Sequence, residues 1–123
     1  MTAIIAFARG HWLRSTSSRH TFMENKTTCA VSIVIPTLNS ERTLEVCLRS
    51  ILAQTMPRDS FEIVLADAGS ADDTLDIARA CGVDKNVENL LKTGEAGKAA
   101  GIQAASGDII ALVDSDNILP DPE

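Results

Sequence analysis

The 123-residue sequence contains no tyrosine, and its two histidines both precede residue 29. From Cys29 onward the chain therefore has no imidazole that could act as a general acid or base or bind a metal. The same region has a single aromatic side chain, Phe61, and so lacks the aromatic platforms on which single-stranded nucleic acids stack. Any catalytic or metal-binding chemistry after residue 28 must depend mainly on carboxylates.

Cysteine is scarce as well. Cys29, Cys47 and Cys81 are odd in number and far apart, which argues against a disulfide framework and against a Cys-x-x-Cys site. Cys47 and Cys81 fall on apolar helix faces and are predicted to be core residues. This usage fits a reducing, cytoplasmic compartment. No run approaches the roughly 20 apolar residues of a membrane-spanning helix, although peripheral membrane attachment of a full-length protein stays open.

Negative charge is concentrated after residue 28. Residues 1–28 carry four Lys/Arg and one acidic residue, a net charge of +3, whereas residues 29–123 carry seven Lys/Arg and 16 acidic residues, a net charge of −9. So acidic a region repels nucleic acid and anionic membranes unless a cation intervenes. We therefore expect no nucleic-acid partner.

Residues 1–28 are expected to form a leader outside the folded domain. The segment up to Met23 is rich in Arg and Ser and almost free of acidic residues, which is typical of a disordered extension, of sequence read from too early a start, or of an organellar transit peptide. Met23 is an alternative start. The folded domain is expected over residues 29–123.

Apolar strand-like runs alternate with helix-like periodicity through this domain. Asn39 or Ser40 is expected to cap the first helix, and the sequence from Ser70 to Asp73 has the spacing of a capping box before the second. The alternation predicts an α/β fold, an open, doubly wound and mainly parallel sheet. The expected strands cover residues 31–35, 61–66, 87–91 (weakly) and 108–113, and the expected helices cover residues 44–52, 75–81 and 98–106.

Polar clusters follow three of these strands. They are residues 37–41, Asp67, and the Asp114-Ser115-Asp116 segment. Ligands of such sheets bind outside the carboxyl ends of the strands. Asp114 and Asp116 can face one hard cation, Mg²⁺ or Mn²⁺, that is shared with substrate phosphates. Asp-rich turns are also ordinary turn chemistry, so the metal prediction depends on their place after an apolar strand.

One basic residue is predicted where a phosphate could use it. Lys98 is expected at the start of a helix after a glycine loop, where backbone N–H groups favour anions; a solvated surface lysine is the alternative. The segment 94–99 has too short a glycine spacing for a P-loop, no Ser/Thr after the lysine, and no G-x-G-x-x-G pattern. These absences argue against P-loop ATPases and dinucleotide-dependent oxidoreductases.

Four sequence blocks together resemble the amino-terminal half of the family 2 glycosyltransferases, which have the GT-A fold. They occur in the family's order and at its usual spacing, and the resemblance extends over nearly all of residues 31–122. The blocks are VSIVIPTLN (residues 31–39), SILAQT (50–55), EIVLADAGSADDT (62–74) and GIQAASGDIIALVDSD (101–116).

The resemblance implies a binding site for a nucleotide-diphosphate sugar. It also implies inverting glycosyl transfer to an unknown acceptor, with the general base beyond Glu123, so we expect the chain to be a truncated, donor-binding part of such an enzyme. Ala68 stands where the family often has a second Asp, and Ala99 and its neighbours stand where the family often has an Arg-x-Asn-type element. The implied site has Pro36, Thr37 and Glu41 around the nucleoside, Asp67 accepting from the base, Lys98 near the base or phosphate, and Asp114, Ser115 and Asp116 as the DxD motif holding Mg²⁺ or Mn²⁺.

Other functions of the same fold class would require different residues after the first strand. A non-catalytic remnant or interaction module stays open as the alternative. A phospho-receiver domain would need paired acidic residues after the first strand, where residues 37–39 provide none. A nucleotidyltransferase of similar fold would need a basic, glycine-rich loop at the same place, which is also missing.

Overall fold

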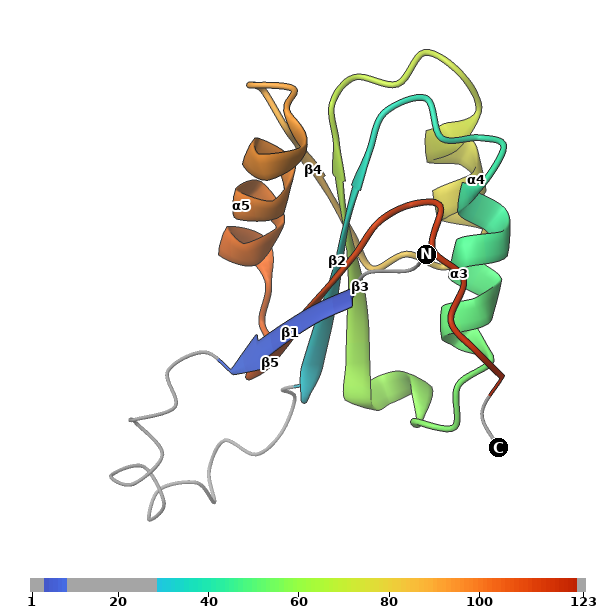
Figure 1. Ribbon diagram of the computed structural model, residues 1–123, viewed down its shortest axis with the longest axis vertical. Coiled ribbons are helices and arrows are strands. Elements are labelled where there is room, and N and C mark those ends of the chain that lie inside the picture. Colours follow the sequence, from blue (N-terminus) through green and yellow to red (C-terminus); the bar gives the residue numbers. More distant parts are fainter. Residues whose placement is uncertain (1–3, 9–28, 122–123) are drawn as a thin grey trace.

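A computed structural model, which describes residues 4–8 and 29–121, shows a five-stranded sheet covered on both faces (Figure 1). The strand order is β1-β5-β2-β3-β4; β2 is parallel to both of its neighbours, β3 is parallel to β4, and β1 is antiparallel to β5. This confirms the predicted α/β fold with a mainly parallel sheet. The strands are β1 (Ile4–Ala8), β2 (Val31–Thr37), β3 (Phe61–Asp67), β4 (Lys85–Glu88) and β5 (Ile109–Val113).

Helices cover the two faces unequally. Helices α3 (Leu44–Leu52) and α4 (Thr74–Ala80) pack together on one face, and α5 (Gly94–Ala104) lies on the other, over β2, β3 and β4 (Figure 1). A single 3-10 turn, η3 (Arg58–Ser60), precedes β3. None of the helices in the described ranges is long and apolar enough to cross a bilayer.

Strands β2 and β3 are apolar on both faces, as expected where helices cover both faces of the sheet. Ile35, Ile63 and Leu65 belong to the cluster under α3 and α4, which also contains Cys47, whereas Val34 and Val64 belong to the cluster under α5. Every residue of β3 is buried. Cys47 is thus a core residue as predicted, and the partly buried Cys81 packs against the same cluster.

Five residues of the segment that was expected to form a leader form the edge strand β1 instead. Residues 4–8 pair with residues 109–113 of β5, so these five residues extend the sheet rather than lie outside the domain. A short apolar run matches both an edge strand and a leader, and only its pairing with β5 decides between them. The rest of the expected leader, and Met23 as a start, fall outside the described residues.

The strand and helix that follow α4 begin earlier than predicted. Strand β4 covers Lys85–Glu88 instead of residues 87–91. Helix α5 begins at Gly94 instead of residue 98, because the Thr93 hydroxyl caps it by accepting from the Ala96 N–H (3.0 Å). The expected glycine loop is therefore the first turn of α5. Lys98 lies one turn inside the helix, so its predicted place at the helix start is wrong.

The caps of the two preceding helices also differ from prediction. The Ser40 carbonyl, not its side chain, accepts from the Leu44 N–H (2.9 Å), and no side chain caps α3. Before α4, Asp72 accepts from the Thr74 N–H (2.9 Å), so the expected capping box does not form. The Ser70 hydroxyl is committed to Asp67 instead.

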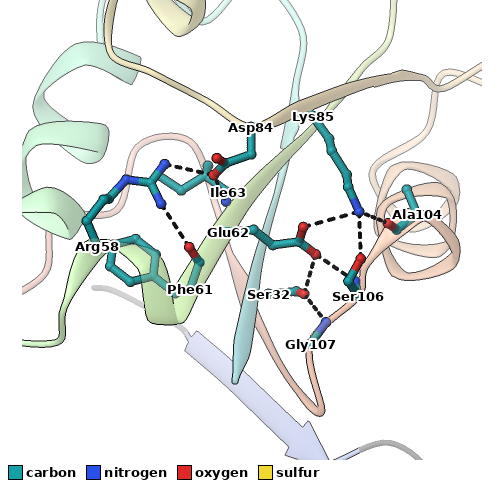
Figure 2. A network of polar contacts seen from close by, with 10 residues as sticks. All are labelled: Ser32, Arg58, Phe61, Glu62, Ile63, Asp84, Lys85, Ala104, Ser106 and Gly107. Carbon is teal, nitrogen blue, oxygen red and sulfur yellow. Dashed lines mark hydrogen bonds and ion pairs between the residues drawn. The ribbon is translucent and has the colours of Figure 1, made fainter. Parts of the chain in front are cut away.

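A buried carboxylate ties the amino-terminal ends of the strands to the turn after α5 (Figure 2). Glu62 Oε2 accepts from the Ser32 hydroxyl (2.6 Å) and from the Ser106 N–H (2.6 Å), and Ser32 Oγ accepts from the Gly107 N–H (2.7 Å). The Lys85 ammonium lies 3.1 Å from Glu62 Oε1. Burial raises the pKa of Glu62, but these hydrogen bonds and Lys85 outweigh it and leave the pKa below its ordinary value.

A second group of contacts anchors η3 beside this network (Figure 2). The Arg58 guanidinium lies over the Phe61 ring (4.8 Å to its centroid), donates to the Phe61 carbonyl (2.8 Å) and pairs with Asp84 (2.7 Å). Asp84 also accepts from the Ile63 N–H (2.8 Å). Charged side chains at this edge of the sheet are thus engaged with one another.

Candidate functional site

The carboxyl ends of the parallel strands bring the predicted site residues to one edge of the sheet. Thr37 of β2 is in register with Asp67 of β3, which is in register with Glu88 of β4. On the other side of β2, β5 ends at Val113 and leads directly into Asp114. The register therefore places Asp67 and the Asp114–Asp116 segment on the same edge, as predicted.

Asp67 is buried and fully hydrogen-bonded by its own chain. Oδ1 accepts from the hydroxyls of Thr37 (2.7 Å) and Ser70 (2.6 Å), and Oδ2 accepts from the N–H groups of Gly69 (3.0 Å) and Ser70 (2.8 Å). Burial raises the pKa of Asp67, but the four hydrogen bonds outweigh it, so the pKa lies below its ordinary value. Asp67 is thus an ionised carboxylate that fixes the loop after β3.

Two adjoining clefts open beside this loop. One, of about 190 Å³, includes Pro36, Thr37 and Ala68 in its lining; the other, of about 260 Å³, includes Asp67. Ala68, Asn89 and Lys92 line both. The remaining lining residues are Leu38, Thr93 and Gly94 in the first cleft and Gly69, Ser70, Leu75, Asn86, Val87, Glu88 and Leu90 in the second.

Asn117 fixes the backbone of the acidic turn after β5 through two hydrogen bonds to Asp114. The buried Asn117 side chain accepts from the Asp114 N–H (3.0 Å), and its own N–H donates to the Asp114 carbonyl (3.0 Å). Ser115 Oγ lies 3.1 Å from Ser40 Oγ in the loop after β2. Asp114 and Asp116 are exposed. The turn thus presents two carboxylates to solvent while its backbone is fixed.

The electrostatic effect of this turn reaches the core below it. Burial, then the charges of Asp116 and Asp114, raise the pKa of the Cys47 thiol to about 11. The Cys47 thiol points at the Asp114 carbonyl (3.7 Å). The charges of Asp114 and Asp116 thus act on the buried thiol below the turn.

The donor set is suited to a cation shared with a substrate. In the described part of the chain, no three or more Asp, Glu, His or Cys side chains gather into a metal cage. Mg²⁺ and related ions are commonly bound by one or two carboxylates together with substrate phosphates and water. Asp114 and Asp116 fit that arrangement, whereas a structural metal would need more protein ligands.

Apart from the three residues of the acidic turn, two predicted residues lie outside both clefts. Glu41 is exposed, and its carboxylate accepts from the Asp73 N–H (3.1 Å), which links the loop after β2 to the start of α4. Lys98 pairs with Glu95 on α5 (3.5 Å). The structure thus brings Pro36, Thr37 and Asp67 together at the clefts and leaves Glu41 and Lys98 engaged elsewhere.

Sequence reasoning missed the segment that closes the clefts on the β4 side. Asn89 is buried; its amide donates to the Thr93 carbonyl (2.8 Å), its Oδ1 accepts from the Lys92 N–H (3.0 Å), and its own N–H donates to the Asp67 carbonyl (2.9 Å). The strand here was predicted over residues 87–91 but ends at Glu88, so Asn89 was assigned to a strand interior instead of the sheet edge. Lys92 directly follows the predicted strand, but no role was assigned to it.

A larger open hollow, of about 820 Å³, lies at the opposite edge of the sheet. Arg58, Glu62 and Asp84 line it, and each is paired within the contacts of Figure 2. Glu62 is also bonded to the Ser106 N–H. The charged groups of these three residues are therefore engaged within the protein, and Cys29 and Asp59 also line the hollow.

Comparison with known sequences finds glycosyltransferases. The chain is 35% identical over 91 residues to glycosyltransferase AglE of Haloferax volcanii, covering 70% of this chain and 30% of that protein. It is 36% identical over 97 residues to the poly(ribitol-phosphate) beta-glucosyltransferase of Bacillus spizizenii, covering 72% of this chain and 15% of that protein. The chain thus spans a third or less of the length of these relatives.

Solved glycosyltransferases share the fold. S. aureus TarS 1–349 in complex with UDP superposes with a TM-score of 0.63 at 29% identity, over 76% of this chain and 29% of that one. Glucosyl-3-phosphoglycerate synthase from Mycobacterium tuberculosis, in complex with Mn²⁺, UDP and glucosyl-3-phosphoglycerate, superposes with a TM-score of 0.62 at 31% identity, over 76% of this chain and 36% of that one. The sheet and its flanking helices match those of GT-A glycosyltransferases.

The family assignment rests on more than half of the chain. The sequence model described as "Glycosyl transferase family 2" matches residues 32–123, which include both the Asp67 loop and the Asp114–Asp116 turn. With the sequence relatives and the shared fold, this match establishes that the chain belongs to glycosyl transferase family 2.

Proposed function

We propose that this chain binds a nucleotide-diphosphate sugar and a divalent cation, Mg²⁺ or Mn²⁺, as the donor-binding part of an inverting glycosyltransferase. The observation that carries the proposal is that the two clefts beside the Asp67 loop and the exposed Asp114–Asp116 turn lie on one edge of the sheet. The two are joined across β2 by the contact of Ser40 with Ser115 (3.1 Å). Similar proteins in complex with UDP, one of them also with Mn²⁺, support it.

The two clefts are proposed to receive the nucleoside. Pro36 and Thr37 line the first cleft, and Asp67 orders the loop that forms the second. All four acceptor positions of the Asp67 carboxylate are already used, so a base that donates to Asp67 must displace the hydroxyl of Thr37 or Ser70. Glu41 and Lys98 can join the donor only by leaving the Asp73 N–H and Glu95.

The acidic turn is proposed to hold the cation through Asp114 and Asp116, with Ser115 beside the diphosphate. A divalent cation at this place neutralises the charge that develops on the leaving nucleoside diphosphate. Asn117 and Ser40 fix the turn, so the two carboxylates need little rearrangement to bind. The general base that takes the acceptor's proton is proposed to come from outside this chain, in a full-length protein.

The proposal is tested by calorimetric titration of the 123-residue chain with UDP, in Mn²⁺ and again in EDTA. We expect binding in Mn²⁺ that EDTA weakens at least about tenfold, because the cation bridges phosphate and carboxylate. Asp114→Asn and Asp116→Asn should each abolish the Mn²⁺ dependence. Asp108→Asn, the same change at the other end of β5, is the matched control and should leave binding unchanged.

The same titration distinguishes a donor site from the alternative, a non-catalytic remnant or interaction module. A folded chain that binds neither Mn²⁺ nor UDP, GDP or any other nucleoside diphosphate would contradict a donor site. That result would instead favour a remnant or an interaction module with the fold of the family.

A further inference from the structure

Lys92 is the basic residue among those that line the two clefts, and the family resemblance did not point to it. It lines both clefts, and its backbone has a φ of 61°, in the left-handed region that non-glycine residues rarely adopt. Asn89 holds it there by accepting from the Lys92 N–H with both its carbonyl (3.2 Å) and Oδ1 (3.0 Å). Gly or Asn would suit such a backbone better, so the lysine side chain is kept at some cost in backbone strain.

The Lys92 side chain reaches across the mouth of the clefts to the loop after β3. A Cβ built at Gly69 would lie 3.2 Å from Lys92 Nζ, which places the ammonium beside the loop that Asp67 orders. Across residues 4–8 and 29–121, no carboxylate lies within ion-pair distance of it. The ammonium has three donors and no acceptor, and here it faces a cleft rather than a salt bridge.

The sheet order tells which end of a donor would meet Lys92. Asp114 follows β5, whereas the Lys92 ammonium lies beside Gly69 in the loop after β3, and these strands are two spacings apart in the order β5-β2-β3. Two strand spacings amount to about 9–10 Å. A diphosphate at the acidic turn thus leaves Lys92 at the far end of an extended nucleoside diphosphate, next to the base and away from the phosphates.

We propose that Lys92 is a specificity-determining residue that donates a hydrogen bond to a keto oxygen on the outer edge of the nucleobase. The inference rests on the proposed donor site and adds the base class to it. An ammonium bonds a keto oxygen, as in uracil or guanine, but opposes the exocyclic amino group that cytosine and adenine carry at the same edge. The chain should therefore prefer keto-base donors.

The test compares UDP with CDP, and GDP with ADP, by calorimetry on the full chain in Mn²⁺. We expect the wild type to bind each keto nucleotide about tenfold more tightly than its amino counterpart, as expected for one hydrogen bond from a charged donor. Lys92→Met should bring both ratios to within about twofold, and Lys92→Arg should keep most of the preference. Leu91→Gln, at the neighbouring exposed position outside both clefts, should change nothing.

The outcomes separate this inference from the proposed function. Nucleotide binding that Lys92→Met weakens equally for all four nucleotides, or does not change, overturns the role of Lys92 while leaving the donor site standing. A wild type that binds no nucleotide in Mn²⁺ overturns both. Met at position 92 must adopt the same left-handed backbone as Lys, so the substitution should not disturb the fold. Circular dichroism of each variant checks that the variant is folded.

Discussion

Substitution of Gly101 by alanine tests how closely α5 packs on the sheet. A Cβ at this position would lie 2.3 Å from Val34 Cγ1, 3.3 Å from Val34 Cβ and 3.4 Å from Val34 Cγ2. Carbon atoms in contact prefer about 3.5–4.0 Å, so the helix or Val34 must move by more than 1 Å. Val34 is fully buried and β-branched, so rotation about its χ1 is restricted.

The cost follows from two opposing effects. Overpacking of a core typically costs about 1–3 kcal/mol, and a clash this short belongs at the upper end. Alanine in place of glycine inside a helix returns about 1 kcal/mol. We therefore expect Gly101→Ala to lower the free energy of unfolding by about 2 kcal/mol, which for a domain of about 100 residues lowers the Tm by about 10 °C.

Urea denaturation followed by far-ultraviolet circular dichroism measures this difference. Gly94→Ala is the matched control, because nothing lies within 4 Å of a Cβ built at Gly94 in the first turn of the same helix. It should leave stability unchanged or raise it by up to about 1 kcal/mol. Equal stability of the two variants would refute the close approach of α5 to β2.

Two further predictions concern groups whose pKa is shifted. Because the pKa of Glu62 lies below its ordinary value of 4.5, its ionised form stabilises the fold above that pH; Glu62→Gln should cost about 2 kcal/mol at pH 7, and the difference should vanish as the pH falls through the lowered pKa, as measured by urea denaturation from pH 7 to pH 2.5. A Glu62→Gln chain that stays as stable as the wild type at pH 7 would contradict the network of Figure 2. With its pKa raised to about 11 and its side chain buried, Cys47 should resist iodoacetamide at pH 8 while the partly exposed Cys81 reacts, as read by mass spectrometry with a urea-unfolded sample as control. Equal labelling of the two cysteines in the folded chain would argue against that burial.

The central part of the fold could be predicted because its signals are local and strong. Strands β2 and β3 are apolar on both faces, which is how buried parallel strands read. The two edge strands, β1 and β4, have weak sequence patterns. Strand β4 is short, with alternating burial, and β1 pairs with β5 alone. Gly97 was interpreted as a loop residue, but it lies within α5 where a Cβ would come within 3.0 Å of Pro36 and Asn89. Its glycine serves close packing.

The location of the candidate site could be predicted from the sequence, but its side-chain contacts could not. Parallel pairing places Asp67 and Asp114 at one edge whatever the loops do, so two strand ends were sufficient to locate it. Sequence could not tell that the Asp67 carboxylate is saturated by its own loop, since that depends on where the Ser70 hydroxyl turns. Nor could it place Lys92, whose position depends on the left-handed turn that Asn89 stabilises.

The most direct test of a donor site at this edge is the ¹⁵N–¹H spectrum of the chain titrated with UDP in Mg²⁺, and then with a trace of Mn²⁺. UDP should shift the amides of Ala68, Asn89 and Lys92, and Mn²⁺ should broaden first the amides of residues 114–117. The two sets would then mark the base end and the diphosphate end of one ligand. Shifts confined to the opposite edge, around Arg58 and Asp84, or no shifts in a folded chain, would contradict the account.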